Sequence, residues 1–134
     1  MSTATKLSSE WMERKMPESK TFTGGCHCGL VRYECTSDLA MVNACNCSIC
    51  TKKGLHFTFV PPQSFQLRAG EESLKEYLFN RRVIRHQMCS ECGVEPFARG
   101  VKPDGTDVIA VNVATVDGIE LSKLTMTPVD GRNM

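Results

Sequence analysis

The segment Cys45-Asn46-Cys47-Ser48-Ile49-Cys50 places three thiols within six residues. Once deprotonated, cysteine offers a soft anionic sulfur, and a tetrahedral zinc ion binds such sulfurs at about 2.3 Å. Two sulfurs on one zinc ion then lie roughly 3.8 Å apart, which C-x-C and C-x-x-C segments reach when the backbone turns around the metal. Disulfide-bonded cysteines instead need Cα atoms about 4.4–6.8 Å apart with aligned Cβ vectors. The segment is therefore predicted to be a metal site.

Two further cysteine motifs flank this segment along the chain. They are Cys26-His27-Cys28-Gly29 and Cys89-Ser90-Glu91-Cys92-Gly93, and each ends in a glycine that can adopt positive φ. Structural zinc takes four protein ligands, whereas catalytic zinc takes three and keeps an open position. Joining the two flanking motifs would give a four-cysteine site and leave the central triplet as an open site. The spacing leaves other pairings open.

The eighth cysteine, Cys35, stands apart from the three motifs. It ends the alternating segment 30–35 on the same face as Val31 and Tyr33. An alternating pattern is typical of a strand with one buried face. Cys35 is therefore predicted to be a buried core thiol and not a ligand.

Length and composition describe an ordinary folded chain. Its 134 residues are 41% hydrophobic and 23% charged, which suits one globular domain and includes no apolar run long enough to span a membrane. The opening MSTATKLSSEWMERK carries charges where a signal peptide needs apolar residues, which predicts a cytoplasmic protein. Clustered thiols in that compartment are more often metal ligands than disulfides. The formal charge of +1 gives no support to a nucleic-acid partner.

Short alternating segments separated by glycine and proline predict a mostly β fold with little helix. Residues 1–20 are predicted to be an N-terminal extension and residues 21–134 a single zinc-binding domain. A short helical turn is predicted at 51–54, and residues 114–134 show no pattern longer than one strand.

The predicted strands cover residues 30–35, 56–60, 65–68, 74–79, 83–88, 95–99 and 108–113. Residues 22–35 are predicted to form a β-hairpin that turns at the first cysteine motif. The glutamates of 74–79 would also suit a helix, but the tight turn at Asn80, Arg81 and Arg82 favours a second hairpin with 83–88.

The segments GGCHCG, CNCSIC and CSECGVEPF, followed by the strand 110–113, resemble the glutathione-dependent formaldehyde-activating family, which includes centromere protein V. The segment CNCSICTKKG is especially similar to the centromere protein V branch. The resemblance to the family as a whole covers residues 21–121. It implies an Mss-four-like fold of several short coiled antiparallel β-sheets pinned by zinc. It also implies two zinc ions, a structural one at Cys26, Cys28, Cys89 and Cys92, and a labile, active-site one at Cys45, Cys47 and Cys50.

The resemblance further implies a carbon–sulfur lyase, similar to S-(hydroxymethyl)glutathione synthase, that acts on glutathione or a related thiol and its aldehyde adduct. The chemistry of the triplet agrees with this function. A zinc ion with three thiolates carries a net negative charge, so it polarises a carbonyl less than a zinc ion held by neutral histidines. Such a centre is better suited to lowering the pKa of an incoming thiol and orienting it.

Polar residues near the motifs are further candidates. His27 and His56 could act as acid–base groups because imidazole titrates near neutrality, and His56 is the stronger candidate for a catalytic group. Lys52 and Lys53 are predicted to bind the carboxylates of glutathione, and Arg81, Arg82 and Arg85 are further cations that could do so. Two other functions stay open, a non-catalytic zinc module that contacts protein or nucleic acid, and a carrier of glutathione or metal. An exchangeable fourth ligand on one zinc would distinguish the enzyme from both.

Overall fold

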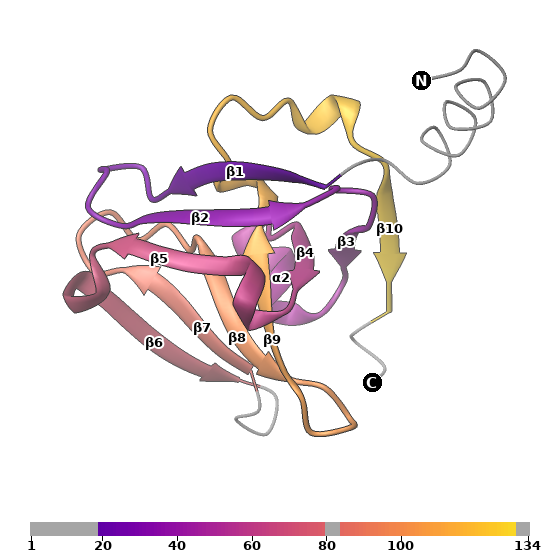
Figure 1. Ribbon diagram of the computed structural model, residues 1–134. Coiled ribbons are helices and arrows are strands. Elements are labelled where there is room, and N and C mark those ends of the chain that lie inside the picture. Colours follow the sequence, from indigo (N-terminus) through magenta and orange to yellow (C-terminus); the bar gives the residue numbers. More distant parts are fainter. Residues whose placement is uncertain (1–18, 80–83, 131–134) are drawn as a thin grey trace, which may run out of the picture.

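The structure is a computed structural model that describes residues 19–79 and 84–130, and this part of the chain is built from strands in two sheets (Figure 1). The three-stranded antiparallel sheet has the order β1 (Lys20–Gly25), β2 (Arg32–Ser37), β5 (Phe65–Ala69). The seven-stranded sheet has the order β10 (Met126–Val129), β3 (Val42–Cys45), β4 (Phe57–Val60), β9 (Asp107–Asn112), β8 (Phe97–Val101), β7 (Ile84–Cys89), β6 (Leu74–Phe79). The predicted mostly β architecture is confirmed.

One short α-helix, α2 (Ser48–Lys53), carries the last thiol of the central triplet. It ends at Gly54, which has φ 66° and donates its N–H to the carbonyl oxygen of Cys50. This left-handed cap confirms the predicted helical turn, although the helix begins three residues earlier than predicted. The other helical elements within residues 19–79 and 84–130 are 3₁₀ turns, η1 (Pro62–Ser64), η2 (Glu71–Ser73), η3 (Val113–Thr115) and η4 (Leu121–Lys123).

The main core lies between the two sheets. Tyr33, Cys35 and Phe65 of the three-stranded sheet pack against Val60, Phe97, Ile109 and Val111 of the seven-stranded sheet. The ring of Phe65 lies 5.4 Å from the ring of Tyr33 and 4.7 Å from that of Phe97, between centroids. Because side chains alternate across a strand, the neighbours of these residues face the other side of the large sheet.

That other side of the seven-stranded sheet carries a second cluster. Phe57 from β4, Ala98 from β8 and Ala110 from β9 pack there with Cys50 and Leu55, which belong to α2 and the segment after it. The large sheet therefore separates the main core from the face on which the central thiols lie.

The predicted strands and hairpins are largely confirmed. Segment 74–79 is strand and pairs with β7, as the hairpin hypothesis required. The strands β3 and β10 were not predicted, and they pair in parallel, which departs from an all-antiparallel expectation. Four-residue strands are too short to show a period, and β10 is an edge strand that tolerates Pro128. The predicted N-terminal extension lies largely outside the described residues, as do the predicted turn at 80–82 and its two arginines, Arg81 and Arg82.

Cys35 is fully buried in the main core, which confirms its predicted burial. Burial raises the pKa of its thiol to about 11, so it stays protonated near neutrality. We expect Cys35→Ala to bind as much metal as the parent protein and to lose about 1–2 kcal/mol of unfolding free energy through a small cavity. Metal content and urea unfolding check this, and loss of one metal equivalent would show that Cys35 is a ligand.

Candidate metal centres

Four thiols from two distant knuckles meet at one end of the molecule. Cys26 and Cys28 follow β1, while Cys89 ends β7 and Cys92 lies in the turn after it. Their sulfur atoms all lie within 4.8 Å of one another. The sulfur of Cys28 is 3.5 Å from that of Cys26 and 3.6 Å from that of Cys89, close to the separation of two ligands on one tetrahedral ion. The structure therefore brings together the four residues that the resemblance implied.

The backbone of each knuckle turns around these sulfurs. Gly29 and Gly93 have φ of 86° and 79°, which confirms the predicted use of glycine after each motif. The N–H of Val31 donates to the sulfur of Cys26 at 3.3 Å, and the N–H of Glu91 donates to the sulfur of Cys89 at 3.4 Å. Such contacts stabilise thiolates over thiols.

The four thiols share protons unevenly when no cation lies between them. The N–H of Leu30 lowers the pKa of Cys28, but desolvation and the neighbouring thiols outweigh it and raise that pKa to about 12. Desolvation raises the pKa of Cys92, but the N–H groups of Val94 and Cys28 and the thiol of Cys89 lower it to about 6. A divalent cation would allow all four to ionise, and four thiolates are a donor set that suits zinc. The cluster could therefore hold a metal ion.

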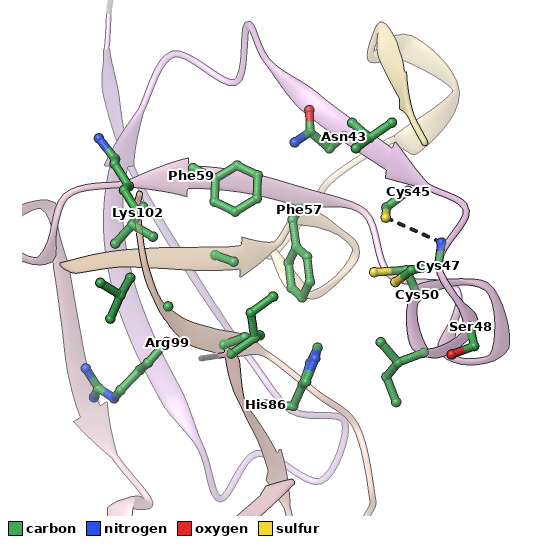
Figure 2. Close-up of a pocket in the computed structure, with 18 of the residues that line it drawn as sticks. Asn43, Cys45, Cys47, Ser48, Cys50, Phe57, Phe59, His86, Arg99 and Lys102 are labelled. Atoms are coloured by element: carbon green, nitrogen blue, oxygen red, sulfur yellow. Dashed lines mark hydrogen bonds between the residues drawn. The ribbon is translucent and has the colours of Figure 1, made fainter. Parts of the chain in front are cut away.

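The central triplet forms a second cluster on the far side of the large sheet. Cys45 ends β3, Cys47 is the residue before α2, and Cys50 lies within that helix, with all three sulfurs within 4.8 Å of one another. The N–H of Cys47 donates to the sulfur of Cys45 at 3.4 Å, which Figure 2 shows as a dashed line. This cluster could also hold a metal ion, with one ligand fewer than the first.

Local electrostatics distinguish the members of the triplet. Desolvation raises the pKa of Cys47, but the N–H and thiol of Cys50 outweigh it, so the net shift is downward. Burial, followed by the hydrogen bond to Cys47, raises the pKa of Cys50. Without a cation, Cys47 is therefore the better thiolate of these two.

The triplet, unlike the four-thiol cluster, borders a cavity of about 900 Å³. Cys45, Cys47 and Cys50 all line it, and none of Cys26, Cys28, Cys89 and Cys92 does. Other lining groups include Lys52 on α2 and His86 on β7. Figure 2 shows the sulfurs gathered at one end of this space, with Phe57 and His86 beside them. A ligand in the cavity can thus reach one cluster directly.

A buried chain of polar groups runs behind the cavity. Glu95 is almost fully buried, accepts a hydrogen bond from Nδ1 of His86 at 2.6 Å, and forms an ion pair with Nζ of Lys53 at 3.1 Å. Lys53 ends α2 and Glu95 follows the Cys89–Cys92 knuckle, so the carboxylate links the two cysteine centres. No sequence motif marked His86 or Glu95 as a site residue. His86 lies two residues after Ile84 on β7, so the alternation of side chains along that strand places both on the cavity face and could have located His86.

The other predicted site residues have varied positions. Lys52 is exposed and lines the cavity, whereas Lys53 is paired with Glu95 and is not among the lining residues.

His56 donates Nδ1–H to the carbonyl oxygen of Gly54 at 3.1 Å and also does not line the cavity. His27 is exposed at its knuckle, and Arg85 pairs with Glu76 at 3.3 Å. The catalytic role of His56 and the glutathione-binding roles of the two lysines stay predictions.

A family model described as glutathione-dependent formaldehyde-activating enzyme matches residues 21–129. The chain belongs to this family. Proteins provisionally assigned the same activity in Penicillium rubens and Colletotrichum graminicola are 32% and 33% identical over 114 and 109 residues. These matches cover 76% and 72% of this chain, and 59% and 56% of the two relatives' length. The resemblance identified from the cysteine motifs is thereby confirmed.

The fold of this family member also matches a solved structure. A crystal structure of a Rhodobacter sphaeroides protein superposes with a TM-score of 0.67 at 27% identity, covering 78% of this chain and 99% of that one. The expected fold class is thus confirmed at the level of the whole architecture. Within the described residues, no helix has the length and hydropathy needed to cross a membrane.

Proposed function

We propose that the protein makes or breaks the carbon–sulfur bond between glutathione, or a related small thiol, and an aldehyde-derived carbon. The observation that carries this proposal is the difference between the two clusters. The three sulfurs of the triplet line a cavity large enough for a small ligand. The other cluster already offers the four thiols that fill the coordination shell of a tetrahedral ion. Membership of the family supports glutathione as the thiol and formaldehyde as the aldehyde.

We assign structural zinc to the four-cysteine cluster and a labile zinc to the triplet. When bound at the triplet, zinc would supply a Lewis acid that lowers the pKa of the substrate thiol. Residues of the chain itself would bind the substrate and hold the ligands in position. Lys52 lies on the cavity wall, where its ammonium group can bind a substrate carboxylate. Lys53 holds the end of α2 against Glu95, and so fixes the helix that carries Cys50.

Cleavage of a hydroxyalkyl thioether needs a proton acceptor. The hydroxyl proton leaves as the carbonyl forms, and the electron pair of the carbon–sulfur bond goes to the sulfur. We assign the acceptor to His86, because it lines the cavity and its hydrogen bond to Glu95 fixes the proton on Nδ1. In the synthetic direction the same imidazole returns the proton to the oxygen.

The direct test is exchange of labelled formaldehyde between its free hydrate and its glutathione adduct, measured by ¹³C NMR. The uncatalysed exchange sets a background, because thiols and formaldehyde combine unaided. We expect the zinc-loaded protein to raise the exchange rate in proportion to its concentration, and Cys47→Ser to keep the fold but return to background. If neither glutathione nor other small thiols exchange above background with the parent protein, the enzyme hypothesis fails and a non-catalytic zinc module takes its place.

The assignment of the acceptor is tested by comparing two histidine variants. We expect His86→Gln to lower the catalysed exchange rate about 10²-fold, the usual contribution of a positioned acid–base group, while thiol affinity stays unchanged. His56→Gln should keep most of the rate, because the imidazole is hydrogen-bonded to Gly54 and lies off the cavity wall. Far-ultraviolet circular dichroism verifies that both fold. A large loss in His56→Gln alone would return the catalytic role to His56.

A further inference from the structure

The cavity is built on one face of the large sheet. Alternate residues of β4, β9 and β7 point into it, among them Phe57 and Phe59 on β4 and Val108 and Ala110 on β9, and residues 98–101 of β8 border it as well. Figure 2 shows the thiols at one end, Arg99 and Lys102 at the opposite end, and the two phenylalanine rings between them. The space is therefore a groove with two chemically different ends.

The middle of the groove is apolar. Phe57, Phe59, Ile84, Ala98, Val108 and Ala110 supply its surface, and Phe59 keeps 49% of its area exposed there. Backbone amides of a peptide laid along such a wall would lose water without gaining partners. Each unpaired amide lowers affinity about fivefold or more, since its desolvation is not compensated. A hydrocarbon chain or ring gains from the same contact.

The far end of the groove is cationic. Lys102 and Arg99 line it, and among the described residues Lys102 forms no ion pair with a carboxylate oxygen within 4.0 Å. The guanidinium of Arg99 lies over the ring of Phe97, 5.2 Å from its centroid, and so faces the main-core side of the sheet. Lys102 is therefore the cation that the groove presents to a ligand. A cation in this position favours an anionic group at the end of the ligand that lies away from the sulfur.

We propose that the groove takes substrates in which an apolar carbon chain or ring extends from the reacting carbon–sulfur bond and ends in a carboxylate. This inference rests on the proposed carbon–sulfur chemistry and names its substrate class. The apolar part can belong to the thiol or to the aldehyde-derived carbon, and the groove recognises the same chemistry in both cases. Glutathione and formaldehyde then fill the sulfur end and leave the groove largely empty.

Calorimetric titration of the zinc-loaded protein with a thiol series tests the proposal without turnover. The probes are 3-mercaptopropionate, 6-mercaptohexanoate, 8-mercaptooctanoate and glutathione, with 6-mercaptohexanol as the uncharged match. We expect Kd to fall about fourfold for each buried methylene, and 6-mercaptohexanoate to bind more tightly than glutathione. The carboxylate should improve affinity about two- to fivefold over the alcohol, as for a partly exposed ion pair.

Two variants locate the effect in the groove. A Cβ on Gly100 would meet only Val108 Cγ1, at 3.6 Å, so Gly100→Leu fits the backbone and fills the apolar section. It should remove most of the chain-length dependence and leave 3-mercaptopropionate binding within twofold of the parent. Lys102→Gln should remove the preference for carboxylate over alcohol. Lys123→Gln, whose lysine pairs with Glu120 at 3.5 Å and does not line the groove, is the matched control.

A second arm distinguishes the source of the apolar part. Glutathione is offered with formaldehyde or with 6-oxohexanoate, and exchange is measured for each adduct. Faster catalysed exchange with 6-oxohexanoate places the chain on the aldehyde, whereas tight binding of 6-mercaptohexanoate alone places it on the thiol. If short thiols and glutathione bind but both arms are insensitive to chain length, the substrate class is wrong and the proposed function stands. If no thiol binds, both are wrong.

Discussion

Replacing Cys89 with serine is expected to leave a chain that is largely unfolded or aggregated. Cys89 is 1% exposed, and its sulfur lies 3.6 Å from that of Cys28, a residue 61 positions away in the chain. A metal ion held here joins the β1–β2 hairpin to the end of β7. Structural zinc contributes about 10–16 kcal/mol in small zinc-dependent folds, as much as the whole stability of a typical domain. Thermal unfolding and metal analysis measure the loss.

Ser90→Ala is the matched control, because Ser90 is the exposed neighbour in the same knuckle and offers no thiol. It should unfold at the same temperature as the parent protein and bind the same amount of zinc. A Cys89→Ser protein that retained a native thermal transition and a full zinc complement would show that the four-cysteine centre does not hold a metal.

The second large effect is expected at Glu95, where Glu95→Gln should cost about 3–5 kcal/mol of unfolding free energy. Its side chain is 1% exposed and faces the equally buried His86 and the partly buried Lys53. Removing the charge leaves the partly buried ammonium group of Lys53 without its partner and weakens the buried hydrogen bond from His86. Breaking such a pair costs more than the net strength of the intact pair. Urea unfolding of the zinc-loaded protein gives the value.

A surface ion pair provides the comparison for Glu95. Glu34 accepts from Arg68 at 3.0 Å with side chains 36% and 54% exposed. Because water screens such a pair, Glu34→Gln should cost less than about 1 kcal/mol. Equal losses in the two variants would mean that the Lys53–Glu95–His86 chain does not hold α2 in place. A loss of triplet metal in Glu95→Gln, with the four-cysteine metal retained, would strengthen the link to that helix.

The sequence was most informative where structure is local. Thiol spacing, with a glycine after each flanking motif, predicted both knuckles, since a turn around one ion is set by a few consecutive residues. Alternation predicted β2 and the buried position of Cys35. Glycine at 54 predicted the end of α2, because only a residue that tolerates positive φ suits that cap.

Features that depend on register and on distant pairing were not predictable in the same way. The parallel contact of β10 with β3 joins segments more than eighty residues apart, and neither strand is long enough to show a period. The cavity floor arises only when β4, β9, β8 and β7 are aligned. His86 and Glu95 are ordinary polar residues in the sequence, and only the fold buries them together.

Cobalt substitution followed by addition of glutathione tests most directly whether one centre is closed and the other open. Tetrahedral cobalt reports its ligands through its absorption spectrum. The two centres can therefore be followed separately through stepwise loading with cobalt and through the Cys47→Ser variant, which lacks one ligand of the triplet. We expect two cobalt ions per chain, of which a mild chelator removes one first. Glutathione should change the spectrum of that labile ion and leave the other unchanged. A spectrum that glutathione and other small thiols leave untouched, together with equal resistance of both ions to the chelator, would contradict the open centre at Cys45, Cys47 and Cys50.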